Sequence, residues 1–228
     1  MADAGPVAIL TAIPEELAGI RRAVPQSGKV VLGCTGDGPR RAAAGAATFL
    51  ERHKPSVLVG AGLAGALTPG LSVGELVASR RVRFEVGDVA TPDPRLLERA
   101  IAAGARPGTL ITVGRPIVSP VARAALAGAD FGDEAAVDME SAAWAREAAA
   151  RGIPYVVVRA ISDAADEELP AFLAQALGSD GSIRRGEVAR RALLEPSSWG
   201  TLLRMRRRMH DLSASLGAFL ARMLGVRP

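Results

Sequence analysis

The stretch Tyr155–Asp163, YVVVRAISD, decides the class of fold. Its run of consecutive apolar residues is typical of a strand that is buried on both faces, as in a parallel sheet. Arg159 interrupts this run, and a buried arginine needs an anionic partner. The strand ends next to Ser162 and Asp163. Because ligands bind at the carboxyl ends of the strands in such sheets, we expect Asp163 to lie at a functional site.

Elsewhere in the chain, similar apolar runs alternate with stretches rich in alanine, leucine and arginine. The runs predict strands at Val7–Ala12, Val30–Cys34, Ser56–Gly60, Glu75–Val82, Thr109–Val113, Ala135–Asp138 and Tyr155–Ile161. The stretches predict helices at Pro14–Val24, Pro94–Ala103, Val121–Ala127 and Ser141–Arg151, and one from the turn at Gly36–Pro39 to about His53. This alternation predicts an α/β fold: a single three-layer α/β/α domain with a mostly parallel, mixed central sheet.

The character of the sequence changes after Pro170. Helical stretches are predicted at Ala171–Leu177, Gly186–Leu194 and Trp199–Leu224. We therefore divide the chain into an α/β core at residues 1–169 and a helical C-terminal extension at residues 170–228. Leucines recur at helical spacing in the last helix, which predicts that it packs on the core. Its basic cluster at Arg204–Arg208 leaves a peripheral contact with anionic lipid open.

Composition excludes several classes of protein. Apolar residues make up 49% of the 228 residues and charged residues 23%, as in ordinary globular domains. Aromatics are only 4%, too few for a base-stacking platform, so we expect no nucleic-acid partner. The single cysteine, Cys34, forms no internal disulfide, and we predict neither a metal nor a cofactor. No apolar run reaches the roughly 18–20 residues of a membrane span. We expect a cytoplasmic protein and leave a homo-oligomer open.

The glycine-rich stretch Gly60–Gly65, GAGLAG, matches a dinucleotide-binding fingerprint. That fingerprint requires a helix to begin at its third glycine, so that the helix N-terminus meets the pyrophosphate. Here Leu67–Gly70, LTPG, follows, and a helix across it is implausible. We therefore reject a dinucleotide site. The glycines instead allow the backbone to approach a ligand at the end of a strand.

Four segments together carry a family resemblance. They are Ala8–Glu16, Lys54–Leu67 continuing to Leu71–Val77, Ala136–Ser141 and Val157–Asp163. In order and spacing they resemble the nucleoside phosphorylase and nucleosidase superfamily, which includes methylthioadenosine/S-adenosylhomocysteine nucleosidases. The resemblance implies cleavage of the N-glycosidic bond of a purine nucleoside, by phosphorolysis or hydrolysis.

Within that superfamily the chain looks most like the hopanoid-associated phosphorylase branch. The Asp138–Ser141 form, a compact middle region, Asp180-Gly181 and the final leucine- and arginine-rich helix carry this likeness. It implies an adenosylhopane-type substrate in hopanoid biosynthesis. The alternatives are a methylthioadenosine/S-adenosylhomocysteine nucleosidase and, in another class, a non-catalytic nucleoside-binding module.

The chemistry requires one acid at the base and one anionic group beside the sugar. The resemblance implies that Asp163 protonates N7 of the purine and that Glu16 activates the attacking water. The alternatives without a catalytic role are that Ser162 and Asp163 cap a helix and that Glu16 is a favourable anion in a helix's first turn.

The resemblance also assigns substrate-binding and nucleophile positions. Glu140 would bind the ribose hydroxyls and Met139 would pack on the sugar. The remaining substrate-binding positions are Ser162, Gly65, Ala64 and Val118. Arg159 and Gly62 would form a phosphate or nucleophile pocket; the alternative for Arg159 is that it only pairs with Glu16. Leu63 departs from the polar residue common in relatives, and the purine-stacking aromatic has no clear match near Ile117.

Overall fold

The structure is a computed structural model that describes residues 5–87, 91–127, 134–175 and 199–226, together with Gly178, Gly186 and Arg190. The elements are β1 (Val7–Thr11), α1 (Pro14–Ala23), β2 (Val30–Cys34), α2 (Pro39–His53), β3 (Val57–Ala66), β4 (Leu76–Phe84), α3 (Pro94–Ala102), β5 (Arg106–Thr112), α4 (Pro120–Leu126), β6 (Ala135–Asp138), α5 (Ser141–Ala149), β7 (Tyr155–Asp163), α6 (Phe172–Gln175) and α8 (Trp199–Leu224). The predicted Asp180-Gly181 turn, and Gly186–Leu194 except for Gly186 and Arg190, lie outside the described residues.

The strands form one mixed sheet, as predicted. Its order is β2-β1-β3-β6-β5-β4-β7, and β7 also pairs with β3. Most neighbouring strands are parallel, whereas β3 with β6 and β4 with β7 are antiparallel. Because β7 returns to β3, the strands β3, β6, β5, β4 and β7 close into a ring. The sequence predicted the sheet but not this closure.

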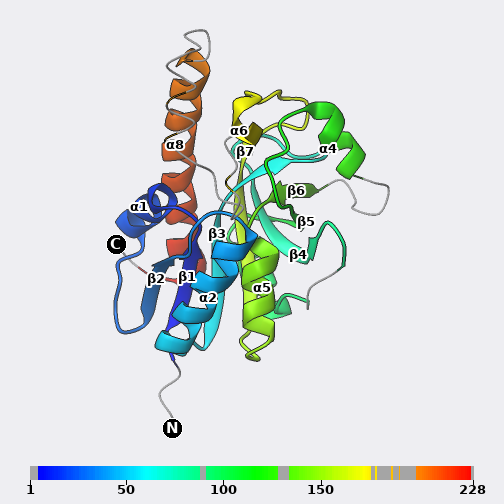
Figure 1. Cartoon of the computed structure of the whole chain (residues 1–228). Coiled ribbons are helices and arrows are strands. Elements are labelled where there is room, and N and C mark those ends of the chain that lie inside the picture. The colour runs from blue at the N-terminus through cyan, green and yellow to red at the C-terminus, as the bar shows by residue number, and fades with distance from the viewer. Residues whose placement is uncertain are drawn as a thin grey trace.

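Helices cover both faces of the sheet (Figure 1). On one face α2 and α5 pack against a core that includes Leu10, Leu50 and Trp144. On the other face α1, α3 and α8 pack against a second core that includes Ile9 and Phe219. Neighbouring residues of β1 therefore enter different cores, because side chains alternate along a strand. The three-layer prediction is confirmed.

The final helix divides into two halves. From Leu212 onward its apolar side chains are buried, and this half packs mainly on α1. Leu216, Phe219 and Leu220 are completely inaccessible to solvent. The predicted packing of the leucine stripe is confirmed for this half. The first half rises beyond the sheet (Figure 1), and there Leu203 is 56% exposed.

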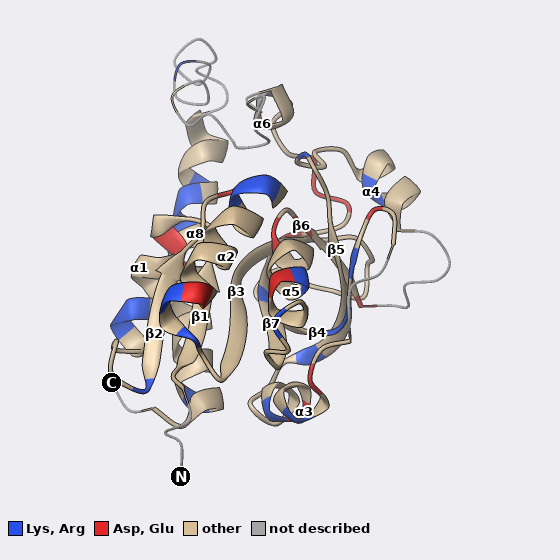
Figure 2. Ribbon diagram, turned by 60° about the horizontal axis from the view of Figure 1, so that its bottom comes forward, with Lys and Arg blue, Asp and Glu red and all other residues tan. Residues whose placement is uncertain are grey.

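Charge is dispersed over the surface. Figure 2 shows lysine and arginine on several helices and strands rather than gathered on one element. Within the described part of the chain, every helix is too short or too polar to cross a membrane.

The largest local difference from expectation is β3. It was expected to end at Gly60 but continues to Ala66, through the glycine-rich stretch. Glycine ordinarily weakens a strand. Here residues Leu58–Gly65 pair with β7 along almost its whole length, and this pairing holds the glycines extended. The third glycine therefore begins no helix, which agrees with the rejection of a dinucleotide site.

The packing of α8 predicts a large cost for truncating its buried face. Leu216→Ala should lower the free energy of unfolding by about 2–5 kcal/mol, because it removes a buried side chain and leaves a cavity. Ser215→Ala, at the exposed neighbouring position, should change it by less than about 0.5 kcal/mol. Urea denaturation followed by circular dichroism measures both, and equal stabilities of the two variants would contradict the packing role of α8.

Candidate active site

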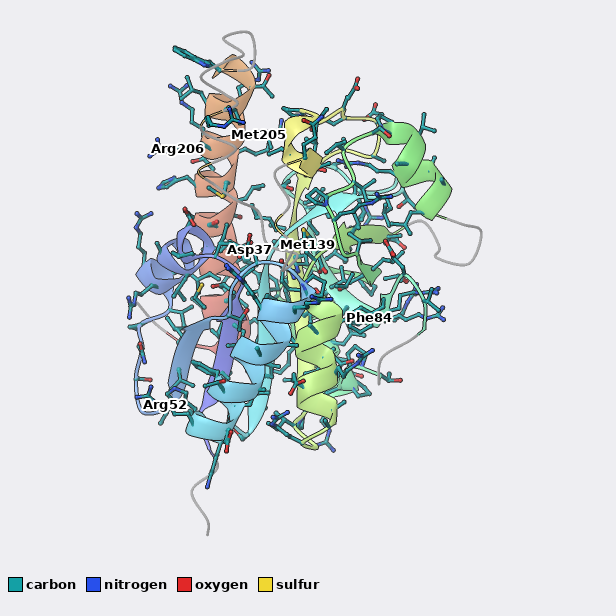
Figure 3. The ribbon with its side chains drawn as sticks, in the orientation of Figure 1. Asp37, Arg52, Phe84, Met139, Met205 and Arg206 are labelled. Carbon is teal, nitrogen blue, oxygen red and sulfur yellow. The ribbon has the colours of Figure 1, made fainter. Side chains whose placement is uncertain are left out.

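A cavity of about 310 Å³ lies where several strands end. Residues from β3, β6 and β7, from the segments after β1, β2, β5, β6 and β7, and from α1 and α4 line it. They are Ala12, Ile13, Glu16, Asp37, Leu63, Ala64, Gly65, Val113, Pro116, Ile117, Arg123, Val137, Asp138, Met139, Glu140, Ser162, Asp163 and Leu169. In Figure 3, Asp37 and Met139 lie in the middle of the molecule, between the α1 and α5 sides. Five of these side chains are carboxylates and one is a guanidinium.

Arg159 lies beside this cavity and is inaccessible to solvent. Its Nε is 2.9 Å from Oδ2 of Asp138, and its Nη2 is 3.3 Å from Oε2 of Glu140. Its Nη1 donates to the carbonyl of Leu63, and its guanidinium lies over the ring of Trp144, 4.8 Å from the centroid. The arginine is thus bound on several sides, as burial of its charge requires.

Asp138 connects the arginine to the start of α5. One of its oxygens accepts hydrogen bonds from the hydroxyl of Thr112 at 2.7 Å and from the amides of Glu140 and Ser141 at 3.1 Å each. The other oxygen accepts from the hydroxyl of Ser141 and pairs with Arg159. Asp138 therefore fixes the backbone turn that presents Glu140 to the cavity.

Glu140 is held in the cavity by its neighbours, and its pKa is shifted from the ordinary value of 4.5. Its Oε1 accepts from the amide of Gly38, at the N-terminus of α2, at 3.0 Å. Burial raises its pKa to about 7; Arg159 opposes the rise, and Asp138 adds to it. A carboxyl group with a pKa near neutrality gains and loses its proton easily at physiological pH.

Glu16 reaches the cavity from the first turn of α1. Its Oε1 accepts from the amide of Leu63 at 2.9 Å, and its Oε2 accepts from the amides of Ala12 at 3.1 Å and Ile13 at 3.4 Å. Burial raises the pKa of Glu16, while Arg159 and these amides oppose the rise. The favourable first-turn anion and the cavity carboxylate are therefore the same group.

Asp163, at the end of β7, is only 8% exposed. Its Oδ1 accepts from the hydroxyl of Ser162 at 2.5 Å, and its Oδ2 is 2.5 Å from Nη2 of Arg123. The residues after it form a turn rather than a helix, so the alternative of a helix cap is wrong. Arg123 escaped the sequence analysis, because a single arginine among the alanines of α4 carries no distinguishing pattern.

The glycines of β3 make room for these charged groups. A Cβ on Gly62 would lie 2.7 Å from Oε1 of Glu16 and would also clash with Nη1 of Arg159. A Cβ on Gly65 would lie 2.5 Å from Oδ2 of Asp163. In the described structure the glycines thus admit the chain's own side chains, whereas the sequence suggested only the approach of a ligand.

The structure brings most of the predicted site residues to one cavity. Those that line it are Glu16, Ala64, Gly65, Met139, Glu140, Ser162 and Asp163. Arg159 and Gly62 lie against Glu16 and Glu140 without lining it. Val118 is set back as well, and its carbonyl accepts from the amide of Leu169 at 2.9 Å. Among the described residues no cluster of His, Cys, Asp or Glu is arranged to hold a metal ion.

A second cavity, of about 360 Å³, adjoins the first and shares Ile13, Leu63, Ser162, Asp163 and Leu169 with it. Its other lining residues are Glu15, Leu173, Leu202, Met205, Arg206, Arg208 and Met209, most of them on α8. Met205 and Arg206 lie on the first half of α8 (Figure 3). The wall is mainly apolar, and its charged residues include Glu15 and two arginines.

The chain is similar to known proteins over most of its length. The family model described as Phosphorylase superfamily matches residues 6–193. A 5′-methylthioadenosine/S-adenosylhomocysteine nucleosidase of Actinobacillus succinogenes is 36% identical over 160 residues, which are 61% of this chain and 70% of the relative.

Solved structures share the fold across nearly the whole chain. The nucleosidase of the same name from Neisseria meningitidis, in complex with methylthio-immucillin-A, has a TM-score of 0.71 at 22% identity and covers 96% of this chain and 98% of its own. Futalosine hydrolase of Helicobacter pylori has a TM-score of 0.72 at 16% identity, with 97% and 98% covered.

These matches define the class of protein as an enzyme that cleaves a glycosidic bond. The chain belongs to the phosphorylase superfamily. The predicted family is therefore confirmed.

The prediction of an adenosylhopane-type substrate, and with it a place in hopanoid biosynthesis, is wrong. The similar curated proteins are nucleosidases for methylthioadenosine and S-adenosylhomocysteine. The structure also explains why the Asp138–Ser141 motif does not indicate the substrate. The motif builds the network around Arg159 and the turn at Glu140, and neither feature depends on what a nucleoside carries at its 5′ carbon.

The raised pKa of Glu140 predicts a pH-dependent stability. A carboxyl group with a folded pKa of about 7, above its ordinary 4.5, stabilises the fold fully below pH 4.5, and this contribution is lost as the pH rises through about 7. Glu140→Gln stays neutral throughout. The stability of wild type relative to Glu140→Gln should therefore fall between pH 5 and about pH 8.

Denaturant titrations at several pH values measure this difference. Glu51→Gln, on the exposed face of α2, is the matched control and should show no comparable trend. A constant difference between wild type and Glu140→Gln would contradict the raised pKa.

Proposed function

We propose that this chain hydrolyses the N-glycosidic bond of adenine nucleosides that carry a 5′-thio substituent, as its relatives' names suggest. The observation that carries the proposal is the meeting of Glu16, Glu140 and Asp163 in one cavity at the ends of β3 and β7. Such a cavity offers an acid that can protonate the purine, an anion that can lie beside the sugar and a proton acceptor for the attacking water. No part of this requires a cofactor.

In the proposed reaction Asp163 acts at the purine. Its carboxyl shares a proton with N7, so that the C1′–N9 bond breaks with its electron pair on a neutral base rather than on a purine anion. The hydroxyl of Ser162 and the guanidinium of Arg123 bind one carboxylate oxygen each and set its direction. Each oxygen retains a lone pair for the base.

Glu140 and Glu16 act on the other side of the bond. As C1′ becomes cationic, the carboxylate of Glu140 accepts hydrogen bonds from the ribose hydroxyls and stabilises the positive charge. Met139 lines the same part of the cavity and packs on the sugar. Water adds to C1′ and gives its proton to Glu16. The pKa of Glu16, raised by burial, makes it a stronger base than an exposed carboxylate.

The charge of the cavity favours water over phosphate as nucleophile. Arg159 is already bound by Asp138 and Glu140, and Arg123 is bound by Asp163. A phosphate dianion would enter a space lined by five carboxyl groups, and both arginines already pair with carboxyl groups of this space. Leu63, where relatives commonly carry a polar residue, offers phosphate only its backbone. The predicted phosphate role of Arg159 is therefore not part of this proposal.

The second cavity suggests where the 5′ substituent lies. It adjoins the first beside Asp163 and Leu63, and its walls include Leu173, Leu202 and Met205. An apolar arm on the 5′ sulfur would leave water for this surface. The mainly apolar wall supports a thioether substituent over the free 5′ hydroxyl of adenosine.

The reaction predicts release of free adenine from 5′-methylthioadenosine without phosphate, at a rate that added phosphate does not increase. Asp163→Asn should lower kcat by about 10²-fold or more, the usual contribution of a general acid. Asp166→Asn, at an exposed position three residues further on, should leave kcat within about twofold. Liquid chromatography of the released adenine measures turnover by wild type and by both variants. Turnover that requires phosphate would refute hydrolysis.

The apolar cavity predicts a preference for longer arms. Each buried methylene contributes about 0.8 kcal/mol, so 5′-butylthioadenosine should show a KM about tenfold or more below that of the methylthio compound. Met205→Gln should reduce this preference and leave the KM for the methylthio compound nearly unchanged. Leu203→Gln, at the exposed position nearby on α8, is the control. Equal KM values for both substrates in wild type would rule out this placement of the arm.

A further inference from the structure

Arg123 is a buried charge in the site that sequence reasoning did not assign. It belongs to the short helix α4, and only 1% of it is exposed. Its Nη1 donates to the carbonyl of Ala66 at 3.2 Å and to that of Ala164 at 2.9 Å. Its Nη2 pairs with Oδ2 of Asp163 at 2.5 Å. One guanidinium therefore joins α4 to the end of β3, to the last residue of β7 and to the residue that follows β7.

The contacts of Arg123 depend on the planar guanidinium, which a lysine lacks. A planar guanidinium directs several N–H groups in fixed directions, whereas an ammonium is a single point charge. The two carbonyls fix the plane of the guanidinium, and the plane in turn fixes the direction of Nη2. The oxygen of Asp163 is held between this donor and the backbone of Gly65, where even a Cβ would stand 2.5 Å away.

A purely structural ion pair explains this arrangement poorly. The Nε of Arg123 is buried without a hydrogen-bond partner among the described residues, and such an orphan donor lowers stability. Buried ion pairs are in any case weak stabilisers, because desolvation offsets their attraction. The pair also lines the cavity instead of lying in one of the apolar cores.

We propose that Arg123 is the positioning residue for Asp163. This role rests on the proposed function: Arg123 fixes the direction of the carboxyl group that protonates the purine. Arg123 holds one oxygen of the Asp163 carboxyl group and leaves the outer lone pairs directed at the purine. Arg123 itself touches neither base nor sugar in this account and acts only through Asp163.

The experiment is a double-mutant cycle on adenine release from 5′-methylthioadenosine. Its members are wild type, Arg123→Met, Asp163→Asn and the double variant, with kcat and KM determined for each. Arg123→Met should lower kcat by about 10²-fold in the wild-type background, comparable to loss of a general acid, with KM changed less than about threefold. In the Asp163→Asn background the same change should lower kcat by less than about threefold, since groups that act as a unit are not additive.

Controls separate positioning from general damage. Arg123→Lys keeps the charge without the planar fork and should retain an intermediate kcat. Arg95→Met, at an exposed position on α3, should leave kcat unchanged. Thermal melting and circular dichroism verify folding of each variant. If Arg123→Met does not fold, Arg123→Lys is compared in the same two backgrounds.

The outcomes distinguish the two proposals. Equal slowing by the Arg123 change in both backgrounds, or no slowing in wild type, would overturn the positioning role and leave the proposed function standing. A wild-type protein that releases no base from the nucleoside would overturn the proposed function, and this inference with it. If each single change lowers kcat and the double variant is hardly slower than Asp163→Asn alone, the result supports both proposals.

Discussion

The buried guanidinium of Arg159 is the constraint on which the rest of the site depends. A charge that is inaccessible to solvent must find anions, and Asp138 and Glu140 supply them within 3.3 Å. Asp138 in turn fixes the turn between β6 and α5, so the need to neutralise Arg159 dictates the direction of Glu140. The same charge moderates the pKa of Glu16, which belongs to a helix more than 140 positions earlier in the chain. One buried cation on β7 thus brings together two segments that are distant in sequence, the turn between β6 and α5 and the first turn of α1.

The sheet accommodates these charges through residues that lack side chains. Gly62 and Gly65 lie on β3 opposite the strand that carries Arg159 and Asp163, and a Cβ at either would occupy the space of a guanidinium or a carboxylate. The ring closure acts in the same direction. Because β6 and β7 both pair with β3, the turns that follow β6 and β7 meet across the glycine-rich end of β3. The glycine pattern that resembles a dinucleotide fingerprint is therefore explained by packing of charged side chains.

Local patterns predicted the elements well, and long-range contacts account for what they missed. Proline at the first turn and apolar periodicity located α1, α2, α3 and α8 to within a few residues, since these signals act within one element. The extension of β3 depends on pairing with β7, about 100 positions later, which no local signal contains. Within the site, the carboxylates stood out because they lie at the ends of apolar strands or in the first turn of a helix. Arg123 did not stand out, because its partners Ala66, Asp163 and Ala164 are brought to it only by the fold.

The two arginines divide the site into ends of different charge. Arg159 faces Glu16, Asp138 and Glu140, so three carboxyl groups share one cation at one end of the site. At the other end Arg123 pairs with Asp163. Under the proposed function this asymmetry serves the reaction, because positive charge develops on the sugar while the base departs without net charge. The excess of negative charge that would stabilise a cationic sugar also repels a phosphate dianion. Under the proposed function, hydrolysis and stabilisation of the sugar cation therefore follow from the same distribution of charge.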